Sequence, residues 1–156
     1  MTAAPGGFSA SPSCSNPAAG AWETFAHGAD VGVRGFGSSP AEAFANAGMA
    51  LTSVVTSPGA VRPIRPRVIR CSAPDLGLLL YDWLNALITA MAVDRLLFGR
   101  FEVEIDGQVL VARAFGEPLD VARHEPAVEV KGATFTELEV ARDPDGRWRA
   151  QCVVDV

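Results

Sequence analysis

Residues 76–114, LGLLLYDWLNALITAMAVDRLLFGRFEVEIDGQVLVARA, change their hydrophobic period from that of a helix to that of a strand. In the first half, apolar residues recur at helical spacing and form a wide face, which predicts a central helix that begins near Pro74-Asp75. From Arg100 onward apolar and charged residues alternate, which is typical of a half-buried strand. Asp106-Gly107 then predicts a tight hairpin turn into a second strand at residues 109–114.

Another helix is predicted upstream of this stretch. Ser39 has the side chain of a good N-cap, Pro40 suits the first helical position, and Glu42 completes the pattern of a capping box. Apolar residues then recur at helical spacing as far as Val55, so one face of this helix is expected to be buried. Pro58-Gly59 predicts its end.

The rest of the chain has the composition of strands and turns. The predicted strands are residues 23–26, 31–36, 68–71, 128–131, 134–141 and 148–154. Their order around the two helices predicts a single α+β domain over residues 21–156, with two helices packed on a mainly antiparallel β-sheet. Residues 1–20 are rich in Ala, Gly, Ser and Pro and carry no charge, so they are predicted to be a disordered N-terminal leader.

Composition limits the classes of function. The net charge is −5, from 13 basic and 18 acidic residues, which disfavours strong direct binding to RNA or DNA and favours a cation or a basic protein partner. Cys71 and Cys152 lie among apolar strand residues, so both are predicted to be reduced core residues. With no apolar run expected to reach membrane-spanning length and no signal-peptide pattern, we expect a cytoplasmic protein without a membrane segment.

The C-terminal strand ends in a pair of negative charges. In Gln151-Cys152-Val153-Val154-Asp155-Val156 the Asp155 side chain and the α-carboxylate of Val156 are one residue apart, and a docked strand would require a cation near them. The turn 27–32, HGADVG, is the best candidate to lie beside this strand end, where Asp30 would add a third carboxylate. Such an all-oxygen ligand set suits Ca²⁺ or Mg²⁺ better than zinc. The alternative interpretation is that Asp155 is a solvated end residue and Asp30 bonds only its own backbone. His27 alone is a weak signal for zinc.

Two further polar groups allow two interpretations each. Glu117, Asp120 and His124 lie close together in sequence and have the side chains of acid–base groups, although their spacing alone favours a surface connection. Lys131 interrupts an apolar run, either with its stem packed on the surface or as a positioned cation for a phosphate or carboxylate. The sequence pattern slightly favours a lysine whose stem packs on the surface.

Five segments together give the chain a family resemblance. They are HGADVG at 27–32, PDLGLLLYDWLNAL at 74–87, GEPLDVARH at 116–124, VEVKGATF at 128–135 and the terminal VVDV at 153–156. In this order and combination they resemble archease, and the resemblance covers the chain from Trp22 to its end. It implies an archease-like fold. It also implies a protein that is not itself an enzyme and that activates an RtcB-type RNA ligase.

The resemblance also implies a site and a partner chemistry. The activator would promote guanylylation and multiple turnover of the ligase in tRNA splicing or RNA repair, and would broaden its nucleotide use from GTP to ATP. Asp30, Asp155 and Val156 would bind a metal, with Ca²⁺ expected and Mg²⁺ or Mn²⁺ as alternatives. Lys131 matches the functionally important lysine of the family. Candidate supporting residues are His27, Glu117, Asp120 and His124.

Two departures from the family pattern and two competing functions remain. Gly28 stands where the family usually has Thr, and Phe135-Thr136 stand where Tyr-His is common, so a role for those side chains does not transfer to this chain. The main alternative function is a metal-dependent hydrolase or nucleotidyl-transfer enzyme that uses Asp30, Asp155, Glu117 and His124. A third is a plain binding module whose acidic residues are only solvated.

Overall fold

The computed structural model describes residues 20–156, and residues 1–19 of the predicted leader lie outside this range. In chain order the elements are β1 (Trp22–His27), β2 (Asp30–Gly37), α2 (Pro40–Val55), the 3₁₀ turn η1 (Pro58–Ala60), β3 (Arg65–Ser72), α3 (Leu76–Val93), β4 (Leu96–Asp106), β5 (Val109–Pro118), α4 (Val121–His124), β6 (Gly132–Ala133), β7 (Glu139–Arg142) and β8 (Trp148–Asp155).

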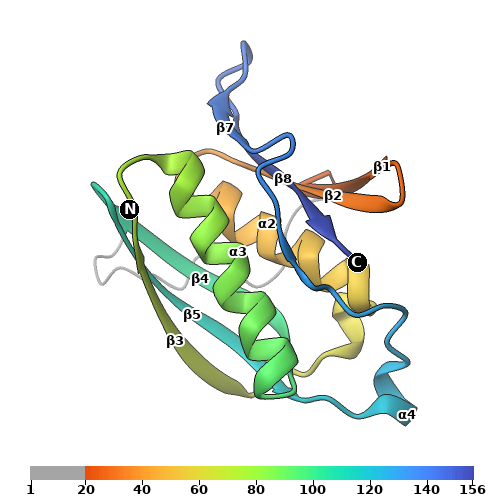
Figure 1. Ribbon diagram of the computed structural model, residues 1–156. Coiled ribbons are helices and arrows are strands. Elements are labelled where there is room, and N and C mark those ends of the chain that lie inside the picture. Colours follow the sequence, from red (N-terminus) through yellow and green to blue (C-terminus); the bar gives the residue numbers. More distant parts are fainter. Residues whose placement is uncertain (1–19) are drawn as a thin grey trace.

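The strands form two antiparallel sheets (Figure 1). The five-stranded sheet has the order β1-β2-β8-β6, with β7 pairing beside β6 along the same edge of β8, and the three-stranded sheet has the order β3-β5-β4. Helix α2 packs against β2 and β8 of the first sheet and against β4 of the second, while α3 contacts strands of both sheets. The predicted α+β domain, with two long helices on antiparallel sheet, is confirmed. The short helix α4 adds a single turn.

Both long helices begin where the sequence predicts, and both have a side-chain N-cap. The Ser39 hydroxyl accepts a hydrogen bond from the Glu42 backbone N–H at 3.2 Å, and Pro40 is the first residue of α2. Glu42 reaches back to the backbone N–H of Ser38, one residue further than in an ideal capping box. In α3, Asp75 Oδ1 accepts from the Leu78 N–H at 2.9 Å. Each side chain satisfies a backbone donor that the helix leaves free.

The core is centred on α3. Trp83 is fully buried, its indole Nε1 donates to the Phe44 carbonyl at 3.0 Å, and its ring meets Phe101 edge to face at 5.8 Å. The bond links α3 to α2, and the ring contact links α3 to β4. Trp83 therefore has the core role expected of it, with its one polar atom satisfied.

Helix α3 also has the length and mean hydropathy of a membrane-spanning helix. The expectation that no apolar run reaches that length is therefore wrong. Length and composition alone are weak evidence for a membrane span, because a buried core helix has the same properties. Here Leu80, Trp83, Leu84 and Leu87 are fully buried within the domain.

Strand β2 lies against α2 with almost no space between the two backbones. A Cβ built on Gly35 would come within 2.2 Å of the Ala43 carbonyl oxygen and of the Ala47 backbone nitrogen. Any larger residue at position 35 would separate β2 from α2. Glycine here sets the distance between the five-stranded sheet and its covering helix.

Two of the predicted strands are wrong. Residues 128–131 are not a strand. Strand β8 ends at Asp155, and the Lys131 N–H already bonds the Asp155 carbonyl, so within the described part of the chain residues 128–130 have no strand beside them to pair with. The segment 134–141 is interrupted: the Thr134 N–H donates to the Val153 carbonyl, the Val153 N–H donates to the Thr136 carbonyl, and Glu137 has a left-handed backbone. The interruption separates β6 from β7.

Candidate functional site

The β1–β2 hairpin determines where Asp30 lies. His27 pairs with Asp30 across the hairpin, so Gly28 and Ala29 form a two-residue turn. Gly28 has a φ of 61°, the conformation that a type II′ turn requires at its first central residue and that glycine adopts without strain. Asp30 is therefore the first residue of β2, at one end of the five-stranded sheet. His27 is exposed on the other arm of the turn.

The C-terminus lies beside Asp30. Strands β2 and β8 are antiparallel with Val31 opposite Val154, so one further step of the register places Asp155 opposite Asp30. The backbone N–H of Val156 points at Asp30 Oδ1, 3.4 Å away. The first turn of the fold and the last two residues of the chain thus meet at one corner of the sheet.

The segment that contains Lys131 forms the third side of this corner. The Lys131 backbone N–H donates to the Asp155 carbonyl at 2.7 Å, and Gly132 pairs with Asp155 in the β6–β8 ladder. The next residue, Ala133, donates its N–H to Asn85 Oδ1 at 2.9 Å, which ties the segment to α3. Sequence reasoning did not single out Asn85, because an Asn on a helix gives no sign of the loop that it will contact.

The chemistry of this corner fits a hard cation. Asp30, Asp155 and the α-carboxylate of Val156 offer only oxygen, and within residues 20–156 none of them forms an ion pair with an Arg or Lys side chain. Over the same range, no three His, Cys, Asp or Glu side chains gather as a metal site. A metal site at this corner would therefore need the α-carboxylate of Val156 beside the two aspartates. Oxygen ligands of this kind suit Ca²⁺ or Mg²⁺.

The second predicted polar cluster lies elsewhere and is buried. Glu117, on β5, is 2% exposed and His124, on α4, is 3% exposed, so the prediction of a surface connection is wrong for both. Glu117 Oε2 lies 2.6 Å from Arg123 Nη2, 2.8 Å from the Arg62 backbone nitrogen and 2.9 Å from His124 Nε2, while Oε1 accepts from Arg62 Nε at 3.1 Å. Among the described residues, no hydrogen bond or ion pair joins this group to Asp30 or Asp155.

These contacts determine the charge states within the cluster. The hydrogen bond from Arg123, with those from Arg62 and His124, holds the pKa of Glu117 far below its usual range despite burial. Asp120 donates its backbone N–H to His124 Nδ1 at 2.9 Å, which leaves the ring proton on Nε2, facing Glu117. Both oxygens of Glu117 are occupied. The cluster connects β5, α4 and the segment before β3.

The cysteines have the environment of core residues. Cys71 and Cys152 are free thiols, Cys152 fully buried and Cys71 partly so. Burial raises the pKa of the Cys152 thiol to about 11, and burial with the nearby Asp82 raises that of Cys71. At neutral pH both are protonated, which is the opposite of what a nucleophile needs.

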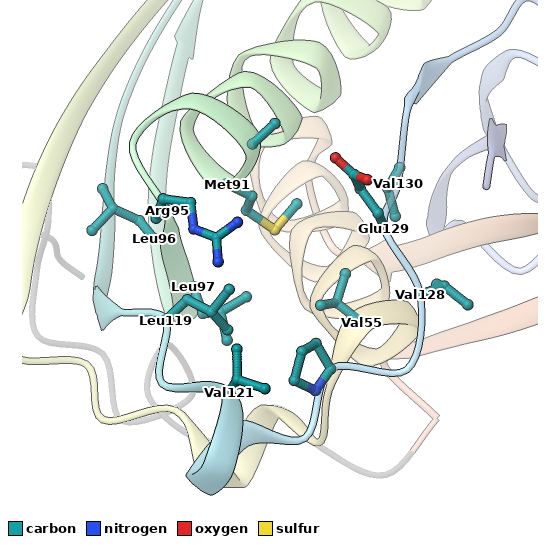
Figure 2. A pocket seen from close by; sticks show the side chains of 12 residues that line it. Val55, Met91, Arg95, Leu96, Leu97, Leu119, Val121, Val128, Glu129 and Val130 are labelled. Atoms are coloured by element: carbon teal, nitrogen blue, oxygen red, sulfur yellow. The ribbon is translucent and has the colours of Figure 1, made fainter.

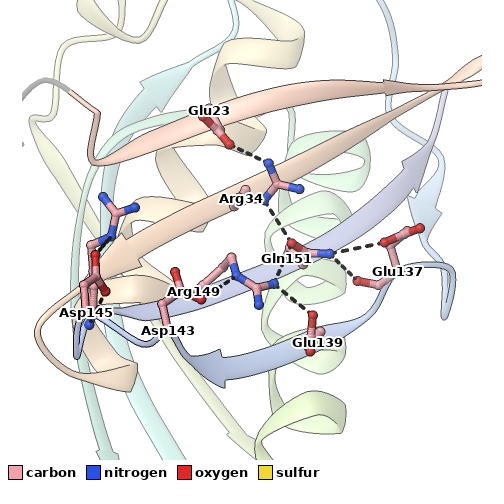
Figure 3. Close-up of polar contacts among 9 residues, drawn as sticks. Glu23, Arg34, Glu137, Glu139, Asp143, Asp145, Arg149 and Gln151 are labelled. Carbon is pink, nitrogen blue, oxygen red and sulfur yellow. Dashed lines mark hydrogen bonds and ion pairs between the residues drawn. The ribbon is translucent and has the colours of Figure 1, made fainter.

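A separate polar network covers the outer face of the five-stranded sheet (Figure 3). Arg34 pairs with Glu23 and donates through Nε to Gln151 Oε1 at 2.9 Å, while Arg149 Nη1 donates to both Gln151 and Glu139 at 2.9 Å. The members lie opposite one another on neighbouring strands, so the network follows the strand register. Its charges neutralise one another, unlike those at the Asp30–Asp155 corner.

Comparison with known proteins identifies the family. The model of the archease protein family matches residues 22–156, the whole length of the domain. The chain belongs to the archease family. The protein archease of Pyrococcus abyssi is 40% identical over 139 residues, which cover 86% of this chain and 98% of that protein. The protein archease of Methanosarcina barkeri is 34% identical over 140 residues, which cover 86% and 95%.

Solved structures agree with the archease assignment. A solution structure of a Methanobacterium thermoautotrophicum protein has a TM-score of 0.76 at 33% identity and covers 87% of this chain and 99% of that one. A crystal structure from Thermotoga maritima, described as an archease and possible chaperone, has a TM-score of 0.54 at 15% identity and covers 86% and 96%. At that identity the second structure shows the fold alone. The archease domain is thus present over nearly its full length.

Proposed function

We propose that this archease is a metal-binding, non-enzymatic activator of an RtcB-type RNA ligase in the cytoplasm. It promotes guanylylation of the ligase and its multiple turnover in tRNA splicing or RNA repair, and it extends nucleotide use from GTP to ATP. Family membership supports the proposal, as does the description of a homologous fold as a possible chaperone. The observation that carries it is the meeting of Asp30, Asp155 and Lys131 at one exposed corner.

The corner has the properties of a site that acts on another protein. Asp155 and Lys131 are exposed, Asp30 is partly exposed, and their backbones are held by β-sheet hydrogen bonds rather than by a mobile loop. A rigid corner that projects charged groups can enter a partner's active site without a large loss of conformational entropy. The chain's net charge of −5 fits a division of labour in which the partner holds the RNA.

Two kinds of charge would act at the shared active site. Asp30, Asp155 and the Val156 carboxylate would hold Ca²⁺, with Mg²⁺ or Mn²⁺ as alternatives, and the bound ion would offset the negative charge of a nucleotide triphosphate. Lys131 places its ammonium group on the adjacent segment. We propose that it contacts the phosphates of GTP or ATP, for which a lysine is a suitable point charge.

The test is a guanylylation assay. Purified chain, its cognate RtcB-type ligase, GTP and Ca²⁺ are mixed, and ligase guanylylation is followed over several turnovers. The wild type should stimulate the ligase, and Asp30→Asn, Asp155→Asn and Lys131→Ala should each remove the stimulation. Asp106→Asn, which changes an exposed Asp at the β4–β5 turn, is the matched charge control and should behave as the wild type.

The outcomes separate the candidate functions. A wild type that leaves the ligase unchanged rules out activation, and three fully active variants rule out the site. Hydrolysis of GTP by the chain alone would instead support the metal-dependent enzyme built on Asp30, Asp155, Glu117 and His124. The occupied oxygens of Glu117 do not favour that alternative.

A further inference from the structure

An apolar pocket lies on the side of the domain where α2 and α3 end (Figure 2). Its volume is about 290 Å³, and its walls come from the ends of both helices, the start of β4, and the chain around α4 and residues 126–130. Every lining residue is apolar except Arg95 and Glu129. The pocket is large enough for one bulky side chain and is built from elements distinct from Asp30.

Exposed apolar side chains extend the pocket to the surface. Val121, on α4, is 60% exposed and Val128 is 40% exposed, and both line the pocket. Two partly exposed valines that line the same apolar pocket are typical of a protein contact surface.

Arg95 adds a charge that the fold does not use. It follows the C-cap of α3 with a φ of 56°, a left-handed conformation that favours glycine and is strained for arginine. Its guanidinium projects toward the pocket in Figure 2, and within residues 20–156 no carboxylate forms an ion pair with it. At this position after the C-cap, glycine would adopt the left-handed conformation without strain. Helix capping therefore does not explain why the residue is an arginine.

The pocket and the Asp30–Asp155 corner share one chain segment. Val128, Glu129 and Val130 form one of its walls, and the next residue, Lys131, is hydrogen-bonded to Asp155. One short segment therefore borders both places. A protein that contacts Lys131 therefore binds next to a wall of the pocket.

We propose that this pocket is a second docking point for the ligase partner. It receives an apolar side chain of the ligase that lies next to an Asp or Glu, with the apolar group between Val121 and Val128 and the carboxylate on Arg95. Glu129, on the opposite wall, opposes an acidic partner and orients the carboxylate toward Arg95. The inference rests on the proposed function, because the ligase is the named occupant.

The test measures the Kd of the full chain for the cognate ligase by calorimetry, together with ligase guanylylation. Val121→Asp and Arg95→Glu should each weaken binding about tenfold or more. The first change puts a charge against the apolar side chain of the ligase, and the second reverses the charge that pairs with its carboxylate. Glu129→Gln should tighten binding about two- to threefold. The matched controls are Val68→Asp and Arg70→Glu, exposed residues of β3 that do not line the pocket, which should leave Kd unchanged.

Arg95→Gly separates docking from folding. Glycine removes the strain at φ 56°, so the melting temperature should stay the same or rise while the Kd for the ligase increases about tenfold. A wild type that binds and stimulates the ligase, with Kd unchanged in the Val121, Arg95 and Glu129 variants, overturns the docking site and leaves the proposed function intact. A wild type that does not bind the ligase overturns both.

Discussion

The backbone N–H of Val156 points at Oδ1 of Asp30, 3.4 Å away, although the two residues are 126 positions apart in sequence. This contact holds the end of the chain beside the first β-turn. Asp30, Asp155 and Val156, which carries the α-carboxylate, thus form one acidic group at this corner. Among residues 20–156, no Arg or Lys is paired with this group, so its charge is available to a cation.

The first prediction concerns the terminus. Adding Gly-Ser after Val156 converts its α-carboxylate into a neutral amide carbonyl and keeps its N–H, so one ligand charge is lost while the contact to Asp30 is retained. Ca²⁺ affinity, measured by calorimetry, should fall about tenfold or more. The same dipeptide added at the N-terminus should have no effect. Equal Ca²⁺ affinity in both extended proteins would show that the terminus is not a ligand.

The second prediction concerns Lys131, the only lysine in the sequence. Its structural contact is made by its backbone N–H, which alanine keeps, and the residue is exposed. Lys131→Ala should therefore leave the melting temperature and Ca²⁺ affinity unchanged while ligase guanylylation is no longer stimulated. Lys131→Arg should recover part of the stimulation, because arginine keeps the positive charge but replaces the compact ammonium group with a planar guanidinium. A stimulation equal to that of the wild type in Lys131→Ala would remove this residue from the site.

The third prediction concerns the buried ion pair of Glu117. Glu117→Gln removes a charge that accepts bonds from Arg62, Arg123 and His124, and should lower the free energy of unfolding by about 1–3 kcal/mol at pH 7. Both arginines stay in contact with water after the change, which limits the loss. Glu23→Gln is the comparison: its side chain is 50% exposed in the pair with Arg34, so its loss should cost about 1 kcal/mol or less.

The pH dependence of this effect has a definite sign. The folded-state pKa of Glu117 is lowered from 4.5, so its contribution is fully present above about pH 4.5 and is lost as pH falls toward the folded-state value. The difference in unfolding free energy between wild type and Glu117→Gln, measured by urea denaturation, should be constant near neutrality and shrink below about pH 4.5. A difference that grows on acidification would contradict the assigned charge states.

The fourth prediction concerns the spacing of β2 and α2. A methyl group on Gly35 meets two backbone atoms of α2 at 2.2 Å, and backbone atoms cannot rotate away as a side chain can. Gly35→Ala should therefore lower the free energy of unfolding by about 2–3 kcal/mol. Gly59→Ala adds the same methyl group where no atom lies within 4 Å and is the control. Equal melting temperatures for the two variants would show that α2 and β2 are not in such close contact.

Local features were predictable from the sequence because they depend on nearby residues. The cap at Ser39, the helix start near Asp75, the turn at Asp106-Gly107 and the apolar stripe around Trp83 are each encoded within about ten residues, and the structure has them where predicted. The predictions failed where the partner lies far along the chain. The segment 128–131 has the pattern of a strand, but the edge of β8 ends before it can pair.

The same distinction applies to the candidate site. The sequence, with its family resemblance, indicated Asp30, Asp155, Val156 and Lys131 as residues of interest. It gave no sign that Glu117 and His124 are buried, because Arg62, which donates two hydrogen bonds to Glu117, lies 55 residues before it. It also gave no sign of the pocket beside Lys131, which segments distant in sequence build together.

By itself the sequence indicated both long helices, most strands and two acidic places: the turn 27–32 with Asp30, and a last strand that ends in two negative charges. Only the tertiary structure decided that these two places meet. The antiparallel register of β2 with β8 aligns Val31 with Val154, and that alignment brings Asp30 beside Asp155 and Val156. Register is a property of two strands together, set by the packing of their buried faces, so neither strand's sequence contains it alone.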